Sequence, residues 1–188
     1  MLVIGFVGFP GSGKSEATVI AKTEGFFPVA MGDAVRSHMH KLGIELSEKN
    51  VGIVANTLRA EHGMDIIAKM CIPLVQALTF QKVVIDGIRG IAEVNAFKRV
   101  FKDDFKLIGI IAGPEVRFKR IKERGRADDP SSFQRFEEKD KRELAWGLEE
   151  ALKAADYSIQ NEGTLEALYS EVSSVLEKLI QQTSTTMS

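Results

Sequence analysis

Near the start of the chain, eight consecutive residues fit the pattern G-x-x-x-x-G-K-[ST], which is typical of loops that bind phosphate groups. Its glycines let the backbone wrap successive N–H groups around an anion, because no side chain stands in the way. A helix that begins at such a loop adds the positive end of its dipole. Lys14 is expected to reach the β- and γ-phosphates of a nucleoside triphosphate, and the hydroxyl of Ser15 to bind Mg²⁺. The predicted donor-binding residues are Gly8, Phe9, Pro10, Gly11, Ser12, Gly13, Lys14 and Ser15.

The segments on either side of this loop match the context that phosphate binding requires. The apolar residues 2–7 predict a strand buried on both faces, and residues 14–22 predict a helix. The same loop occurs in switches, motors and kinases, so it does not by itself name a reaction. The Asn-Lys-x-Asp segment of many guanine-binding switch proteins is absent. Large ATPases usually have two acids in a row at the end of the strand that binds the metal, whereas here Asp86 is followed by Gly87. These features favour a small kinase.

Asp33 and Arg36 follow the apolar run 26–30, which predicts a second strand. They are one helical turn apart, so both side chains can face one cavity above the sheet. Arg36 is then a candidate ligand of an acceptor phosphate, and Asp33 places a carboxylate beside the same acceptor. An N-cap aspartate followed by a solvated arginine explains the same pattern.

Asp86 and Arg89 follow a third strand, predicted at residues 82–85. An acid at the carboxyl end of a parallel strand lies in the crevice where such sheets bind ligands. We therefore expect Asp86 to bind Mg²⁺ through water, together with Ser15, and Arg89 to bind a phosphate through two hydrogen bonds. A turn with an exposed arginine is the alternative. Arg59, in a predicted helix, is a further candidate ligand of the acceptor phosphate.

A strongly basic segment, residues 117–126, holds six basic residues and one acid. Three of its arginines recur every three or four residues, so they should share one helix face. Phosphoryl transfer requires positive charge where negative charge builds up, and arginines in a mobile lid supply it when the lid closes. We expect a lid near residues 120–135, in which Arg120 and Arg126 close over the γ-phosphate. A solvated basic helix face is the alternative.

Strands alternate with helices along most of the chain, which predicts an α/β fold with a parallel sheet between two helical layers. The stretch 37–80 shows no strand pattern and is expected to be a helical insert that holds the acceptor. Residues 131–154 predict one long helix, and 164–180 a terminal one. The chain is therefore predicted to be a single domain over 1–180 with a disordered tail over 181–188. The five strands are predicted at 2–7, 26–30, 82–85, 105–112 and 157–160.

Composition limits the classes of partner. The 188 residues are 44% hydrophobic and 27% charged, with a net charge of −1, which disfavours a protein built to coat nucleic acid. A single cysteine, Cys71, excludes an internal disulfide. The longest uncharged stretches, 1–13 and 70–81, are too short to cross a membrane. We expect a cytoplasmic protein that acts on a small molecule, and the composition leaves its oligomeric state open.

Together, these motifs resemble the nucleoside monophosphate kinase and dephospho-CoA kinase superfamily. The chain looks like an archaeal family of P-loop kinase-like proteins related to dephospho-CoA kinase. Residues 31–36 are similar to the Thr-Gly-Asp-x-x-Arg segment of adenylate kinases, which holds the acceptor phosphate, and residues 86–89 look like their Asp-Gly-Phe-Pro-Arg segment. Residues 125–129 resemble the short lid of UMP/CMP kinases, and residues 155–165 the last strand and loop of dephospho-CoA kinases.

The resemblance implies a three-layer P-loop NTPase fold with strand order 2-3-1-4-5, with ATP and Mg²⁺ as cofactors. It also implies that Asn161 lies beside the adenine. Met31 stands where the nucleotide kinases have threonine, and residues 86–89 lack one residue and the proline, so the acceptor stays open. An arginine-rich site favours an acceptor that carries phosphate. Dephospho-CoA, unlike a nucleoside monophosphate, would also use a base such as Asp33.

The function expected from these residues is transfer of the γ-phosphate of Mg-ATP to a nucleoside monophosphate or a dephospho-CoA-like acceptor. A non-catalytic ATP-binding module that switches a partner protein is one alternative. An RNA-associated ATPase is another, which the near-neutral charge disfavours.

Overall fold

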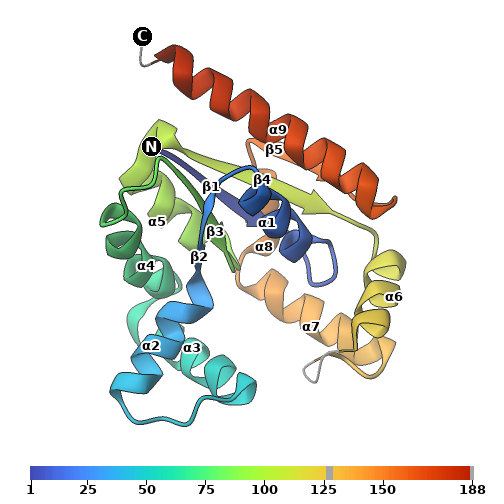
Figure 1. Ribbon diagram of the computed structural model, residues 1–188. Helices are drawn as coiled ribbons and strands as arrows, with labels where there is room; N and C mark the ends of the chain where they lie inside the picture. The colour runs from blue at the N-terminus through green and yellow to red at the C-terminus, as the bar shows by residue number, and fades with distance from the viewer. Residues whose placement is uncertain (126–128, 187–188) are drawn as a thin grey trace.

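The computed structural model describes residues 1–125 and 129–186, without the side chains of residues 48 and 184–186. Its strands form one fully parallel sheet in the order β2-β3-β1-β4-β5 (Figure 1). The parallel pairing and the strand order implied by the resemblance are both confirmed. The strands are β1 (Leu2–Val7), β2 (Phe27–Ala30), β3 (Lys82–Asp86), β4 (Phe105–Ile111) and β5 (Tyr157–Gln160).

Helices connect the strands and lie on both faces of the sheet. The three helices between β2 and β3 form the helical segment predicted at 37–80, which contains no strand. In Figure 1, α2 and α3 lie at the bottom of the view, beyond the sheet. The helices are α1 (Lys14–Thr23), α2 (Met31–Lys41), α3 (Glu48–His62), α4 (Ile66–Gln76), α5 (Ile91–Phe101), α6 (Pro114–Arg124), α7 (Phe133–Ala145), α8 (Leu148–Lys153) and α9 (Leu165–Thr186), with a short 3-10 helix at Lys102–Asp104.

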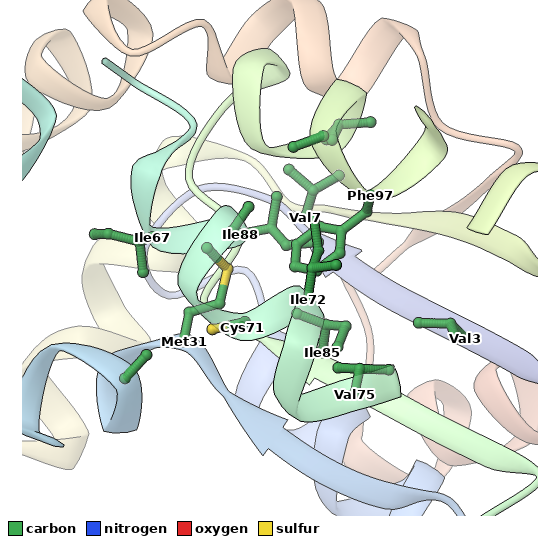
Figure 2. Packing of buried hydrophobic residues seen from close by; sticks show 14 of the residues in the cluster. Val3, Val7, Met31, Ile67, Cys71, Ile72, Val75, Ile85, Ile88 and Phe97 are labelled. Atoms are coloured by element: carbon green, nitrogen blue, oxygen red, sulfur yellow. The ribbon is translucent and has the colours of Figure 1, made fainter. Parts of the chain in front are cut away.

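The central strand β1 shows why the sheet is covered on both sides. Side chains alternate along a strand, so Ile4 and Phe6 face one layer and Val3 and Val7 the other. Ile4 and Phe6 pack in a buried cluster with residues of α1 and α9. Val3 and Val7 pack with residues of α4, α5 and α8, among them Phe97 (Figure 2). The predicted three-layer architecture is confirmed.

One helix predicted from the sequence is broken in the structure, and another is longer than expected. The helix expected over 131–154 is broken between α7 and α8, where Gly147 has a φ of +83°. At this break the chain packs so closely on Gly90 that a Cβ there would lie 1.9 Å from the carbonyl oxygen of Trp146. The terminal helix α9 also continues to Thr186 rather than ending before the expected tail. Among the described residues, no helix combines the length and apolar character needed to cross a bilayer.

Candidate active site

The loop between β1 and α1 is enclosed so tightly that its glycines have no room for side chains. Gly11 and Gly13 have φ values of +80° and +107°, which residues other than glycine rarely adopt. A Cβ on Gly8 would lie 2.3 Å from the carbonyl oxygen of Ile110. A Cβ on Gly13 would lie 2.3 Å from Nδ2 of Asn161. The backbone of the loop, here called the cradle, is therefore packed directly against Ile110 and Asn161.

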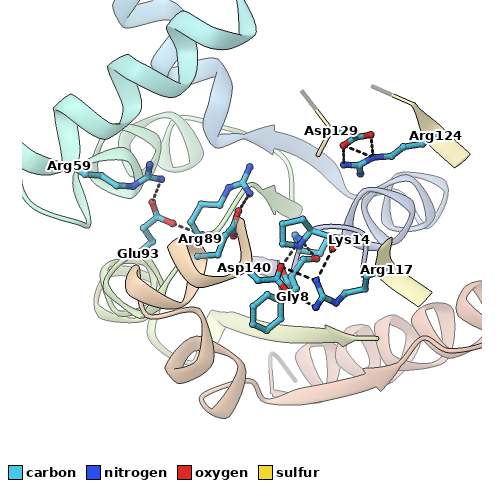
Figure 3. A network of polar contacts seen from close by, with 12 residues as sticks. Gly8, Lys14, Arg59, Arg89, Glu93, Arg117, Arg124, Asp129 and Asp140 are labelled. Atoms are coloured by element: carbon cyan, nitrogen blue, oxygen red, sulfur yellow. Dashed lines mark hydrogen bonds and ion pairs between the residues drawn. The ribbon is translucent and has the colours of Figure 1, made fainter. Parts of the chain in front are cut away.

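Lys14 begins α1, and its ammonium group folds back over the loop. Its Nζ donates hydrogen bonds to the carbonyl oxygens of Gly8, at 2.6 Å, and Phe9, at 3.0 Å (Figure 3). Burial and, to a smaller extent, the charge of Arg89 lower the pKa of Lys14, which is about 7. The carboxylate of Glu143 acts in the opposite direction. An anion bound in the cradle would favour the charged form of Lys14 and so raise its pKa.

Two observations fit the cradle to a nucleoside triphosphate with Mg²⁺. The hydroxyl of Ser12 is buried, and it has no hydrogen-bond partner among the described residues. Buried polar atoms of this kind are normally satisfied, so a bound phosphate oxygen is a fitting partner. The exposed hydroxyl of Ser15 and the carboxylate of Asp86, at the end of β3, are the oxygen ligands that Mg²⁺ prefers. Within the described ranges no three acidic, histidine or cysteine side chains gather to hold a metal, so phosphate oxygens and water would complete the coordination of a bound Mg²⁺.

Arg117 is a buried support of the loop rather than an exposed cation. Its Nη1 donates to the carbonyl oxygen of Pro10 at 3.2 Å, and two of its nitrogens bind the carboxylate of Asp140 at 3.0 and 2.6 Å (Figure 3). The guanidinium lies 4.8 Å from the ring centre of Phe9 and 4.7 Å from that of Phe136. The arginine thus ties α6 and α7 to the phosphate loop.

Arg89 lies on the other side of Lys14 and is held by carboxylates from two helices. Its backbone N–H donates to Oε2 of Glu93 at 2.6 Å, and its Nη1 donates to Oε1 of Glu143 at 2.8 Å. Glu143 is buried, whereas the Arg89 side chain is 40% exposed. Arg89 is therefore fixed in place with part of its guanidinium open to a ligand.

Glu93 also binds Arg59, which connects the site to helix α3. Nη2 of Arg59 donates to Oε1 of Glu93 at 2.9 Å, and the Arg59 guanidinium stacks 5.1 Å from the Trp146 ring centre. Burial raises the pKa of Glu93, and the charge of Arg59 opposes this shift. Arg59, Arg89, Glu93 and Trp146 line one depression, which has no room for a water molecule because Arg59 and Glu93 fill it. Two arginines predicted to bind the acceptor are thereby brought together.

Asn161 and Arg120 form a second support of the loop, at the end of β5. Nδ2 of Asn161 donates to the carbonyl oxygen of Ser12 at 2.8 Å. Arg120 donates to the carbonyl oxygens of Asn161, at 2.9 Å, and Gly163, at 3.1 Å. Asn161 therefore touches the predicted donor site, whereas Arg120 binds the β5–α9 loop. The role expected for Arg120 over the γ-phosphate would require these hydrogen bonds to break.

The remaining candidates are the predicted acceptor residues Asp33 and Arg36 and the arginines of the expected lid. Asp33 lies in the first turn of α2 and forms an ion pair with Arg36, and both side chains are exposed. The N-cap alternative is wrong, because Ala30 is the N-cap of α2 and Arg36 is paired with Asp33. No hydrogen bond joins this pair to the phosphate loop within the described ranges. Arg124 binds the carboxylate of Asp129 at 2.9 Å. Arg126, the second arginine of the expected lid, lies outside the described residues.

Three carboxylates of the site were missed by the sequence analysis: Glu93, Asp140 and Glu143. Each binds an arginine that is a candidate from the sequence: Arg59, Arg89 or Arg117. For two of them a signal existed, because Asp140 and Glu143 are spaced three residues apart on α7 and follow Phe136 by four and seven. Because most residues of α7 are charged, these two acids could not be told apart from the exposed acids of the same helix.

Comparison with known proteins places the chain in a family. A protein-family model described as an AAA domain, AAA_18, matches residues 4–145. A UPF0200 protein of Methanosarcina barkeri is 42% identical over 183 residues, which cover 97% of this chain and 98% of that protein. The chain belongs to the UPF0200 family. The expected membership in an archaeal family of P-loop kinase-like proteins is confirmed.

Other relatives agree with this UPF0200 assignment. A UPF0200 protein of Thermococcus kodakarensis is 38% identical over 185 residues, which cover 97% of this chain and all of that protein. A protein of Archaeoglobus fulgidus described as UPF0200/UPF0201 is 48% identical over 181 residues. These cover 95% of this chain but 56% of the Archaeoglobus protein, so the UPF0200 chain spans little more than half of that relative.

Solved structures share the fold of this UPF0200 chain. TT1252 of Thermus thermophilus has a TM-score of 0.65 at 17% identity and covers 95% of this chain and 97% of its own. A dephospho-CoA kinase of Campylobacter jejuni has a TM-score of 0.63 at 17% identity, with coverage of 96% and 98%. A shikimate kinase of Bacteroides thetaiotaomicron has a TM-score of 0.63 at 14% identity, with coverage of 94% and 98%. The P-loop kinase-like α/β fold is therefore shown.

Proposed function

We propose that this UPF0200 protein is a kinase that transfers the γ-phosphate of Mg-ATP to a small acceptor already carrying phosphate. The observation that carries the proposal is the set of charges around Lys14. Its buried ammonium lies in a glycine cradle, where the charges of Arg89 and Arg117 lower its pKa and those of Asp86 and Glu143 raise it. Phosphoryl transfer depends almost entirely on positioning and on electrostatic stabilisation of this kind.

The donor site of the proposed reaction is the loop 8–15 with its supports. Its backbone N–H groups, the Ser12 hydroxyl and Lys14 bind the triphosphate, while Ser15 and Asp86 provide oxygen ligands for Mg²⁺. Asn161 contacts the loop from the β5 side, where the nucleoside of the donor extends. Bound Mg²⁺ supplies charge that offsets the repulsion between the phosphate groups.

The acceptor site lies between the helical segment 37–80 and the end of β3. Arg89 is 40% exposed there and suits an acceptor that is itself an anion, whereas Arg59 is buried beside it and would have to leave Glu93 to reach that acceptor. Arg36 extends this basic side, and Asp33 acts as base when the acceptor is a hydroxyl, as in dephospho-CoA. A nucleoside monophosphate and a dephospho-CoA-like molecule are the two acceptors that suit these groups.

The lid of the proposed enzyme is residues 120–135, which run from the last turn of α6 to the first turn of α7. Arg120 and Arg126 reach the γ-phosphate when this segment closes, and Arg120 then leaves the carbonyl oxygens of Asn161 and Gly163. The names of two solved structures of the same fold, a shikimate kinase and a dephospho-CoA kinase, support a reaction on a small molecule.

A panel of acceptors tests the proposal. The protein is incubated with Mg-ATP and with nucleoside monophosphates, dephospho-CoA or small alcohols, and ADP release is followed. We expect one phosphate-bearing acceptor to raise the ADP rate at least tenfold over the protein alone. Lys14→Ala should abolish this increase, whereas Lys22→Ala, an exposed lysine of the same helix, should keep it. Binding of Mg-ATP without any acceptor-dependent ADP release would contradict the kinase proposal and favour a non-catalytic module.

A further inference from the structure

Arg89 is held at two points by buried carboxylates, and the two have different effects. Glu93 accepts a hydrogen bond from its backbone N–H and so fixes the main chain after β3. Glu143 accepts a 2.8 Å hydrogen bond from Nη1 and so fixes the guanidinium. No other hydrogen bond of the Arg89 side chain is formed with the residues that the structure describes. Its remaining N–H groups are therefore available to a ligand.

Glu143 is itself held rigidly, because α7 is anchored along one face. Phe136, Asp140 and Glu143 follow one another at helical spacing on this face. Phe136 is 1% exposed and lies beneath the Arg117 guanidinium. Asp140 binds Arg117, which in turn donates to the carbonyl oxygen of Pro10 in the phosphate loop. The position of the Glu143 carboxylate is thus fixed relative to that loop.

The burial of the Glu143 carboxylate is unfavourable for folding. It is 3% exposed, and its second carboxylate oxygen, Oε2, has no hydrogen-bond partner among the described residues. Its negative charge acts on Lys14, in the region where the proposed phosphates bind. A buried acid near an anion site repels the bound anion, so its presence there calls for a favourable role that offsets the repulsion. Orienting Arg89 is the role that the hydrogen bond shows.

We propose that Glu143 is a positioning residue, which holds the guanidinium of Arg89 beside Lys14 so that the two cations bind one phosphate group together. The identity of that phosphate, in donor or acceptor, rests on the proposed function. Binding of a phosphate anion can be measured without turnover, so the positioning role is tested separately. Glu143 acts through Arg89 and does not need to touch the ligand.

Repulsion of the anion and positioning of Arg89 predict changes of opposite sign. The charge of Glu143 also acts on Lys14, and the double variant described below separates that effect from positioning. If Glu143 acted only by repulsion, its removal would tighten anion binding. If it positions Arg89, Glu143→Ala must weaken binding. Glu143→Gln should lie between, because the amide oxygen of glutamine still accepts a hydrogen bond from Nη1. Glu138→Gln is the matched control, since Glu138 lies on the exposed face of the same helix.

The measurement is isothermal titration of the full chain with inorganic pyrophosphate and with Mg-ATP, at one pH and salt concentration. We expect Glu143→Ala to weaken binding of at least one of these probes fivefold or more, Glu143→Gln to weaken it less, and Glu138→Gln to leave it unchanged. Equal or tighter binding of both probes by Glu143→Ala overturns the proposal. Thermal unfolding of each variant checks that it is folded, and Glu143→Gln carries the test if the alanine variant is not.

A double-mutant cycle separates positioning from a general structural role. Arg89→Ala alone should weaken the affected probe, and adding Glu143→Ala should cause no further loss, because Glu143 acts through Arg89. Losses that add in the double variant contradict the proposal. A wild-type protein that binds neither probe would instead contradict the proposed function itself.

Discussion

The side-chain amide of Asn161 donates a 2.8 Å hydrogen bond to the carbonyl oxygen of Ser12, although the two residues are 149 positions apart in the chain. This bond joins the end of β5 to the phosphate loop. On the other side of the loop, Arg117 binds the carbonyl oxygen of Pro10. The cradle is therefore held in its binding shape by residues from the second half of the chain.

Loss of the Asn161 amide should loosen the loop. Asn161→Ala leaves the buried carbonyl of Ser12 without this donor, which should lower the free energy of unfolding by about 1–3 kcal/mol and weaken Mg-ATP binding. Urea denaturation and calorimetry measure the two effects. Asn50→Ala removes a comparable hydrogen bond to the carbonyl of Glu45, but an exposed one, so it should leave nucleotide binding unchanged. Equal weakening of nucleotide binding by both substitutions would contradict this account.

Adding one methyl group to the loop should be far more damaging than adding it elsewhere. In Gly13→Ala the new Cβ meets Asn161 Nδ2 at 2.3 Å and the residue must keep a φ of +107°, so nucleotide binding should be lost. In Gly52→Ala the Cβ, inside α3, meets nothing within 4 Å, so helix propensity should raise the unfolding free energy by about 0.5–1 kcal/mol. Nucleotide binding by Gly13→Ala at wild-type affinity would show that the loop is not rigid.

The lowered pKa of Lys14 predicts a specific pH dependence of stability. Lysine has a pKa of 10.5 when unperturbed and about 7 here, so between these values the unfolded chain binds more protons than the folded one. Stability from this group therefore rises with pH over that window. Lys14→Met lacks the effect, so its stability advantage over the wild type should shrink from pH 7 to pH 10. Urea denaturation at both pH values measures this, and a constant difference would rule out the shift.

The ion pair between Asp140 and Arg117 should contribute more than a surface pair. The two side chains are 16% and 5% exposed, so Asp140→Asn leaves a buried guanidinium without its counter-charge and should lower the unfolding free energy by about 3 kcal/mol. Glu138→Gln, on the exposed face of the same helix, should change it by less than about 0.5 kcal/mol. Chemical denaturation of both variants makes the comparison. A small effect of Asp140→Asn would mean that Arg117 is held by its carbonyl contacts and aromatic neighbours alone.

The features that sequence could predict are those encoded locally. The apolar run 2–7 and the glycines after it predicted β1, the loop and the start of α1 without reference to the rest of the chain. Packing between distant segments was not visible. The break at Gly147 depends on the close approach of Trp146 to Gly90, whereas the helical pattern of 131–154 continues through it.

The same distinction applies to the arginines. Spacing alone put Arg117 and Arg120 on one helix face, as cations of a lid. The structure separates them, because Arg117 is buried against Asp140, 23 residues away, and Arg120 binds the loop after β5, 41 residues away. Whether an arginine supports the fold or faces a ligand depends on such distant carboxylates and carbonyls. Residue type could nominate Arg59 and Arg89, but it could not supply Glu93 and Glu143.

Calorimetric titration with millimolar Mg-ATP tests the central claim, that the backbone around Lys14 binds a nucleoside triphosphate. The account predicts saturable heat from the wild type, loss of that heat in Lys14→Ala and its retention in Lys22→Ala. Absence of heat with both Mg-ATP and Mg-GTP, or undiminished heat in Lys14→Ala, would contradict it.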